Sequence, residues 1–324
     1  VLDLGCFPRL PDSKHFQVER LADGVYAAIA SEQGYAICNA GIIDLGDKTI
    51  VFDSFKTPDA AEDLLRAAHE RTSHKVSYVI NSHYHHDHIR GNQVFSPDTA
   101  IISTSWTREA IAKNEPQRIK SQKENVPQEL LDAQSKLDAE KNPNRRRELA
   151  FWITYHKASI ESLSQLKMRL PNITFEHMLT IHGAGRTVKL LSFRGHTESD
   201  VVLYLPEDRI AFMGDLLFVN MHPYLSDGSP EEWIEVLSKF QTLGVQTAVP
   251  GHGPVGRSVD LSVVIEYIES LETIATDMAK SGKPRDEASC QPVPSRFETW
   301  WFSNFFVPNL EFLLKRAAKA TQEK

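Results

Sequence analysis

The chain has 324 residues, enough to bury a substantial hydrophobic core as one large domain or two medium ones. Its 41% hydrophobic and 24% charged residues are ordinary for a globular protein. The formal charge of −7 argues against general binding to nucleic acid or anionic membranes, and no run approaches the ~20 apolar residues of a membrane span. We therefore expect neither a nucleic-acid partner nor a membrane partner.

The three cysteines indicate the cellular compartment. Cys6, Cys38 and Cys290 lie far apart and show neither metal-ligand nor redox spacing. Reduced, buried thiols are the simplest interpretation, and they favour the cytoplasm. The chain begins at Val1 rather than Met, so a periplasmic or secreted location applies instead if a leader was removed.

The first third of the chain predicts strands followed by a helix. Three segments have strand composition and are separated by turn-prone residues, at 24–30, 35–45 and 48–53. Thr57 followed by Pro58 predicts a helix start, and the helix is expected to end near Arg71. The apolar run 75–80 predicts a buried strand.

The rest of the chain combines further strands with a long helical interruption. Residues 104–171 are charged and helical in pattern, with a break at "KNPN", and the tail from about 259 is helical as well. A helix is expected to begin at Ser229-Pro230, with Glu232 as the reciprocal capping residue. Strand patterns resume at 187–193, 201–206, 209–214 and 247–251.

This alternation predicts an α/β layered architecture over a single domain, 1–324. Within it, about 104–171 forms a helical insert that acts as a cap, and about 259–324 forms a C-terminal helical region.

The stretch "INSHYHHDHIRGN" places four histidines and an aspartate within six positions, directly after the strand predicted at 75–80. Imidazoles packed this tightly repel one another once protonated, and they are costly to bury unless something neutralises them. His83 and His85 are two apart, so both can leave the same face of an extended chain, while Asp87 and His88 follow as the chain turns. The spacing suggests two nitrogen ligands for one cation, and a carboxylate and an imidazole for another.

Three further residues follow predicted strands in the same manner. They are His196 in "FRGHTESD", Asp215 in "AFMGDLLF" and His252 in "VPGHGPVG", each beside a glycine that permits close backbone approach. Strand-end loops on one side of a sheet are where ligands can converge. A single strand-end histidine is more often a hydrogen-bonded structural residue, but four such segments in one chain are hard to attribute to coincidence.

The segments "SHYHHDH", "GHTESD", "GDLLF" and "PGHG", in this order, resemble the metallo-β-lactamase superfamily over about 24–256. The resemblance implies an αββα sandwich with metals at one edge. It assigns one metal to His83, His85 and His196, a second metal to Asp87, His88 and His252, and the bridging position to Asp215.

Two residues beside these ligands also match the family pattern. Asp53, which ends "KTIVFD", corresponds to the buried acidic residue of the family's first motif and would orient a ligand; the alternative is a strand-end cap or turn residue. His86 falls at a free position of the motif. We expect it to face solvent or to lie behind the ligands, and not to bind metal.

Imidazoles and carboxylates without a thiolate suit Zn²⁺, so two zinc ions per chain are expected, with iron or manganese as alternatives. Members of the family that reduce oxygen at a di-iron centre resemble His-x-Glu-x-Asp-His, whereas this chain has His85 at the second position. Hydrolysis is therefore favoured. Two metals about 3.5–4 Å apart can bridge a hydroxide that acts as nucleophile, and Asp87 would orient it or shuttle its proton.

The resemblance also limits the substrate. β-Lactamases of the superfamily generally have cysteine or serine where this chain has Asp215, which instead resembles lactonases, thioesterase-type glyoxalases and phosphodiesterases. Ester, lactone, thioester or amide hydrolysis is favoured, with β-lactam or phosphodiester hydrolysis as alternatives. A mononuclear iron persulfide dioxygenase and a non-catalytic binding protein on the same fold also remain open. The segment "GDLLFVNMHPYLSDGSPEEW" most resembles hydrolases grouped with sulfur-oxidation and quinoprotein systems.

Two regions outside these motifs can shape a pocket for a small, partly apolar substrate. His222 or Tyr224 would reach the substrate's oxyanion, or else stabilise the loop that carries them. The C-terminal aromatic residues would pack in the core, line an apolar pocket together with the 104–171 insert, or form a homodimer contact. These aromatic residues are Trp300, Trp301, Phe305 and Phe306.

Overall fold

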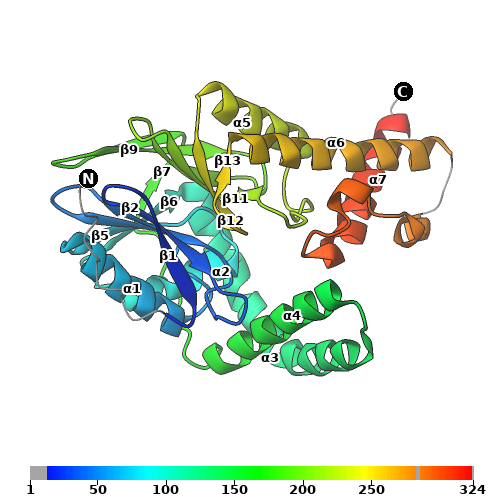
Figure 1. Ribbon diagram of the computed structural model, residues 1–324, viewed down its shortest axis with the longest axis horizontal. Helices are drawn as coiled ribbons and strands as arrows, with labels where there is room; N and C mark the ends of the chain where they lie inside the picture. The colour runs from blue at the N-terminus through cyan, green and yellow to red at the C-terminus, as the bar shows by residue number, and fades with distance from the viewer. Residues whose placement is uncertain (1–12, 282–284, 323–324) are drawn as a thin grey trace, which may run out of the picture.

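Two β-sheets lie face to face in the computed structural model, which describes residues 13–281 and 285–322 (Figure 1). The first sheet has seven strands in chain order: β1 (Phe16–Ala22), β2 (Val25–Ala30), β3 (Ala40–Asp44), β4 (Thr49–Phe52), β5 (Val76–Ile80), β6 (Ala100–Thr104) and β7 (Ile173–Phe175). The second sheet has six strands in the order β13 (Gly256–Arg257), β12 (Thr247–His252), β11 (Ile210–Phe218), β10 (Asp200–Leu205), β9 (Thr187–Phe193) and β8 (Met178–His182).

Helices cover both outer faces of this pair of sheets, as Figure 1 shows. On the first sheet lies α1 (Pro58–Thr72), and on the second lie α5 (Pro230–Thr242) and α6 (Ser258–Lys280), while α7 (Phe306–Gln322) packs against α6. The remaining helices are the short α2 (His86–Ile89), the long α3 (Ser105–Ala139) and α4 (Pro143–Ser162). The αββα sandwich expected from the sequence is therefore confirmed.

Apolar side chains from the facing sides of the two sheets form the central core. Phe52 of β4 and Phe212 of β11 meet there with their ring centroids 5.9 Å apart. On the outer face of the first sheet, α1 buries Ala60, Leu64 and Ala68, which recur at helical spacing. Burial of these surfaces on folding is the main force that holds the layers together.

The direction of the strands brings polar strand ends to one edge of the sandwich. In the first sheet, β4 to β7 run parallel, so the chain leaves β4 at Asp53 and β5 just before His83 at the same edge. In the second sheet, β11 and β12 are also parallel. Gly214 in β11 has φ +53°, and a Cβ there would lie 2.7 Å from the Ser82 Cβ. The absence of a side chain at Gly214 thus lets the edges of the two sheets come into contact.

The helical insert is a hairpin of α3 and α4 between β6 and β7. The break predicted at "KNPN" lies between these helices, where the Asn142 side chain accepts from the Asn144 and Arg145 amides and caps α4. The insert is fixed to the histidine motif by a buried ion pair, with Arg90 Nε 2.6 Å from Glu115 Oε1 of α3. No helix covers residues 163–172, so the helical part of the insert ends earlier than expected.

Several other predictions about local structure need correction. The strand expected at 35–45 begins only at Ala40, because Ile37 has φ 73° and leaves the extended conformation. Ser229 precedes α5 as predicted, but its side chain makes no capping bond, and Glu232 pairs with Arg194 at 3.1 Å. The strands β1, β6, β7, β8 and β13 were not predicted.

The expectation that the cysteine thiols are buried holds only in part. Cys38 is buried and Cys290 is exposed, while Cys6 lies outside the described residues. Within the described part of the chain, no helix combines the length and apolar content that a membrane crossing requires.

The buried Arg90–Glu115 pair generates a first prediction. Glu115→Ala leaves the Arg90 guanidinium buried without its carboxylate, so we expect a loss of about 3–5 kcal/mol in the free energy of unfolding. Denaturant unfolding followed by circular dichroism measures the change. The control is Asp132→Ala, an exposed residue of the same helix, expected within about 0.5 kcal/mol of the parent. Equal stability of the two variants would contradict this role of the ion pair.

Candidate metal centre

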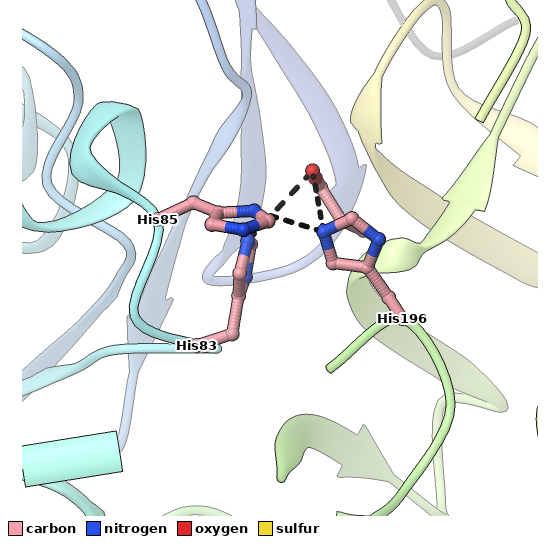
Figure 2. Close-up of side chains that lie close together, drawn as sticks. His83, His85 and His196 are labelled. Atoms are coloured by element: carbon pink, nitrogen blue, oxygen red, sulfur yellow. Dashed lines mark hydrogen bonds and ion pairs between the residues drawn. The ribbon is translucent and has the colours of Figure 1, made fainter. Parts of the chain in front are cut away.

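All seven residues predicted to bind metal lie together at this edge, in two neighbouring groups. The first group contains His83, His85, His196 and Asp215, and the second contains Asp87, His88 and His252. In each group the potential ligand atoms lie within 4.8 Å of one another. Figure 2 shows the side chains of His83, His85 and His196 converging from two separate loops.

Asp215 faces both groups. Its Oδ1 atom lies 3.2 Å from His88 Nε2, while its Oδ2 atom lies 3.5 Å from both His196 Nε2 and His252 Nε2. Gly251 permits this approach, because a Cβ at that position would lie 1.8 Å from Asp215 Oδ1. The carboxylate therefore lies between the two groups, where a bridging ligand would have to be.

Backbone carbonyls fix the orientation of two of the imidazoles. Nδ1 of His196 lies 3.0 Å from the carbonyl oxygen of Tyr224, and Nδ1 of His252 lies 3.2 Å from that of Ile37. A carbonyl oxygen only accepts, so both rings carry a proton on Nδ1 and present the Nε2 lone pair to the site. This is the arrangement that a metal-binding histidine needs.

Asp53 and Ser82 fix two further imidazoles. Nδ1 of His88 lies 2.8 Å from Asp53 Oδ2, and the Ser82 hydroxyl donates to the same oxygen at 2.7 Å. Because that hydroxyl proton is engaged, Ser82 Oγ accepts from Nδ1 of His83 at 2.9 Å. Asp53 thus orients residues of the cluster and does not enter it, in agreement with the first of the two roles considered for it.

His85 is oriented by an acidic residue that the sequence analysis did not single out. Its Nε2 atom lies 2.9 Å from Asp227 Oδ2, which also accepts from the Tyr84 hydroxyl at 2.6 Å. Nδ1 of His85 faces the site, 3.0 Å from Nε2 of His196. Burial raises the pKa of Asp227, but hydrogen bonds from His85 and Tyr84 outweigh it and leave this pKa below its usual value.

The site fits a cation, because several polar atoms aimed into it make no hydrogen bond, although His88 Nε2 and Asp215 Oδ1 face each other at 3.2 Å. Nε2 of His83, Nε2 of His88 and Oδ1 of Asp215 are buried and make no hydrogen bond with any described residue. Unpaired buried polar atoms are costly and need an explanation. A bound cation would satisfy all three at once.

Electrostatics support the same conclusion. Burial lowers the pKa of His83 well below its usual value and that of His196 to about 3, so both rings are neutral, as metal ligands must be. Burial alone would raise the pKa of Asp215, but the neighbouring His88 and His252 hold it well below its usual range. Asp215 is therefore an anion next to the neutral rings of His83 and His196.

The pKa of His88 reflects the negative charges that surround it. Burial lowers its pKa, but Cys38 and the surrounding Asp215, Asp53 and Asp87 raise it well above its usual value. Cys38 does not act as a thiolate ligand, because burial raises its pKa to about 12 and its Sγ atom lies 2.9 Å from the Asp87 carbonyl oxygen. The donors that remain are imidazoles and carboxylates.

A cavity of about 760 Å³ opens beside the ligands and is bounded by the insert and by residues near 302–305. Its polar wall belongs to α3 and consists of Asn114, Gln117, Arg118, Ser121 and Gln122. Its aromatic wall consists of Phe151, Trp152, Tyr155, Phe302 and Phe305. Of the positions considered for the C-terminal aromatic residues, a pocket shared with the insert therefore applies to part of this segment.

The four C-terminal aromatic residues are divided among the positions considered for them. Phe305 lines the cavity, but Trp300 and Phe306 are buried in the core, and Trp300 stacks on Tyr267 with ring centroids 5.5 Å apart. Trp301 lines a second cavity of about 340 Å³, next to the first. The aromatic side chains that line the large cavity therefore include those of the insert together with Phe302 and Phe305.

His222 and Tyr224 have different surroundings. His222 is fully buried, its Nδ1 atom lies 2.9 Å from the Tyr267 hydroxyl, and its amide donates to the Trp301 carbonyl. This favours the structural role considered for His222. Tyr224 lines the large cavity near His85, with their ring centroids 6.5 Å apart, so its position permits substrate contact.

His86 is not exposed to solvent, contrary to one of the two positions considered for it. It is buried, and it contacts Tyr155 and Arg118 of the insert. It belongs to neither ligand group of the described chain. The sequence could not reveal these contacts, because the insert is distant in the chain and its position on the motif depends on the fold.

The comparisons with known proteins agree with this geometry. A family model described as "Metallo-beta-lactamase superfamily" matches residues 34–252. The "Beta-lactamase-like protein 2 homolog" of Caenorhabditis elegans is 22% identical over 326 residues, which are 96% of this chain and 90% of that protein. A hydroxyacylglutathione hydrolase of Synechococcus sp. (strain JA-3-3Ab) is 33% identical over 97 residues, 29% of this chain and 38% of that protein.

Solved structures agree on the fold. A metallo-β-lactamase from Pontibacter korlensis superposes with a TM-score of 0.57 at 17% identity, covering 78% of this chain and 99% of that chain. The DIM-1 metallo-β-lactamase superposes with a TM-score of 0.56 at 14% identity, covering 80% of this chain and 99% of that chain. With the family match over most of its length and the seven residues gathered at the sheet edge, the chain belongs to the metallo-β-lactamase superfamily.

Proposed function

We propose that the protein is a hydrolase that uses two zinc ions to cleave the acyl bond of an ester, thioester, lactone or amide. The observation that carries the proposal is the orientation of the imidazoles. Each of the five predicted histidine ligands has one nitrogen paired with an acceptor outside the cluster and the other directed at the shared site. The donor set, without a thiolate, suits Zn²⁺.

The residues of the chain have separate roles in this proposal. His83, His85, His196 and Asp215 would hold one ion, and Asp87, His88 and His252, again with Asp215, the other. When bound, such a pair of ions lowers the pKa of water and polarises the substrate's carbonyl. Asp87 also lines the cavity, and its Oδ2 atom lies 3.4 Å from His252 Nε2. It is placed to accept a proton from the attacking water.

The cavity supports an acyl substrate with an apolar part. Its aromatic wall can bury apolar groups, while the α3 wall offers amide and hydroxyl side chains to polar atoms. The two Synechococcus relatives are named hydroxyacylglutathione hydrolases, and the matches cover 38% and 54% of their lengths. Hydrolysis of a thioester or ester is the activity we would test first.

Metal content tests the two-ion site. The purified protein loaded with zinc should carry close to two ions per chain, measured by elemental analysis. His88→Ala removes a donor from the second group only, so occupancy should fall toward one ion per chain. His182→Ala, at an exposed strand end, is the control and should keep two. A fully active enzyme with one ion per chain would exclude the two-ion mechanism.

The bridging position gives a second test. Asp215→Asn removes the negative charge that faces both groups, so metal affinity should fall and turnover should decrease by about 10² or more. The exposed Asp98→Asn is the control for the chemical change. Zinc titration and initial rates on a panel of acyl substrates provide the measurement. If Asp215→Asn keeps both ions and the parent rate, Asp215 has no bridging role.

The aromatic wall gives a third test. Trp152 lines the cavity, so Trp152→Ala should raise KM for a substrate with an apolar acyl group and leave metal content unchanged. Trp300 lies in the core, so Trp300→Ala should instead lower stability by about 3–5 kcal/mol with little change in KM. Steady-state kinetics with short and long acyl chains, combined with thermal unfolding, separates the two. A rise in KM for Trp300→Ala, with a loss of stability alone for Trp152→Ala, would contradict the placement of Trp152 in the cavity and Trp300 in the core.

A further inference from the structure

His86 is the one histidine of the "HYHHDH" cluster that the metal site does not use. It is buried at the cavity wall, and both ring nitrogens contact side chains of the insert. Its Nδ1 atom lies 3.0 Å from Nη1 of Arg118 on α3, and its Nε2 atom lies 2.8 Å from the hydroxyl oxygen of Tyr155 on α4. A histidine with two such partners has a definite hydrogen-bonding state.

The contact with Arg118 fixes the tautomer. A guanidinium group only donates hydrogen bonds, so Nδ1 of His86 must be the acceptor. The neutral ring then carries its single proton on Nε2. Of the two groups near Nε2, the Gln122 amide nitrogen at 3.4 Å is itself a donor, so the proton is donated to Tyr155.

The Tyr155 hydroxyl thereby keeps its own proton available for donation. Its oxygen accepts from His86, and the hydroxyl proton has no acceptor among the described residues. The ring is held in place, because Lys56 Nζ lies 3.8 Å from its centroid and Trp152 packs edge-on at 5.4 Å. Tyr155 lines the cavity next to the metal ligands, so the free proton is available to a molecule bound there.

We propose that the Tyr155 hydroxyl donates a hydrogen bond to an oxygen of the bound substrate, and that His86 and Arg118 are positioning residues that set its direction. The three hydrogen bonds then point in one direction: Arg118 donates to His86, His86 donates to Tyr155, and Tyr155 donates to the substrate. Consecutive hydrogen bonds polarise one another, so the terminal hydroxyl becomes a stronger donor. The inference rests on the proposed hydrolase function and adds a substrate contact from the insert.

Removal of the hydroxyl alone tests the contact. Tyr155→Phe should lower kcat/KM by about tenfold or more on the preferred acyl substrate, with zinc content unchanged. The control is Tyr35→Phe, because the Tyr35 hydroxyl also bonds to α4, through Glu161, but does not line the cavity. Parent-like kinetics for Tyr155→Phe would overturn the proposal.

A double-mutant cycle tests the positioning role. Arg118→Met should lower kcat/KM in the parent background, and Arg118→Lys, which keeps a donor, should restore part of the loss. If Arg118 acts through Tyr155, Arg118→Met should have almost no further effect in the Tyr155→Phe background. Additive losses would mean that Arg118 contacts the substrate independently, and they would overturn the positioning role.

A measurement that needs no substrate separates this inference from the proposed function. Nitrogen-15 spectra of the histidine rings should show His86 protonated at Nε2 in the parent, and Arg118→Met should disturb this state. Protonation at Nδ1 would overturn the inference even if the protein is a hydrolase. Conversely, Nε2 protonation in a zinc-loaded protein that cleaves no acyl substrate would reject the hydrolase and the substrate contact, while the hydrogen-bond direction would stand.

Discussion

The site depends on keeping a carboxylate ionised between imidazoles that are almost entirely removed from water. Asp215 occupies this position, and each imidazole around it must turn a lone pair inward, which requires an acceptor for its outer nitrogen. The fold supplies these acceptors from separate places: Asp53 at the end of β4, the Ile37 carbonyl before β3, and Tyr224 and Asp227 after β11.

The close contact between the sheets explains why two positions near the site are glycines. Gly214 and Gly251 lie where β11 and β12 meet the loops of the metal site, and a Cβ at either position would collide with Ser82 or Asp215. The positive φ of Gly214 also redirects the chain within β11, so that Asp215 follows at the site. Backbone geometry and ligand geometry are therefore set by the same few residues.

The clustering of the seven candidate ligands could be predicted from the sequence, because each lies in a short motif directly after a predicted strand. The acceptors behind His196 and His252 could not, since they are backbone carbonyls of Tyr224 and Ile37, and a carbonyl has no residue identity to recognise. The surroundings of His86 could not be predicted, for a related reason. Its partners lie on the insert, and nothing in the motif indicates how the insert docks.

The alternation of strands and helices was sufficient to predict the layers, and Thr57-Pro58 was sufficient to place the start of α1. The errors arose where tertiary contacts override local pattern. Glu232 satisfies the sequence pattern of a capping box but pairs with an arginine instead. The aromatic residues near the C-terminus have similar composition, yet Trp300 lies in the core and Phe305 faces the cavity, a distinction set by the chain's path.

The attachment of the insert has a consequence for how this scaffold can be engineered. The same short segment that carries the predicted metal ligands also holds His86 and Arg90, whose partners Arg118, Glu115 and Gln122 lie on α3. A substitution on α3 that reshapes the cavity wall therefore also alters the support of this segment. Grafting a foreign insert onto this scaffold would require the partners on both sides to be exchanged together.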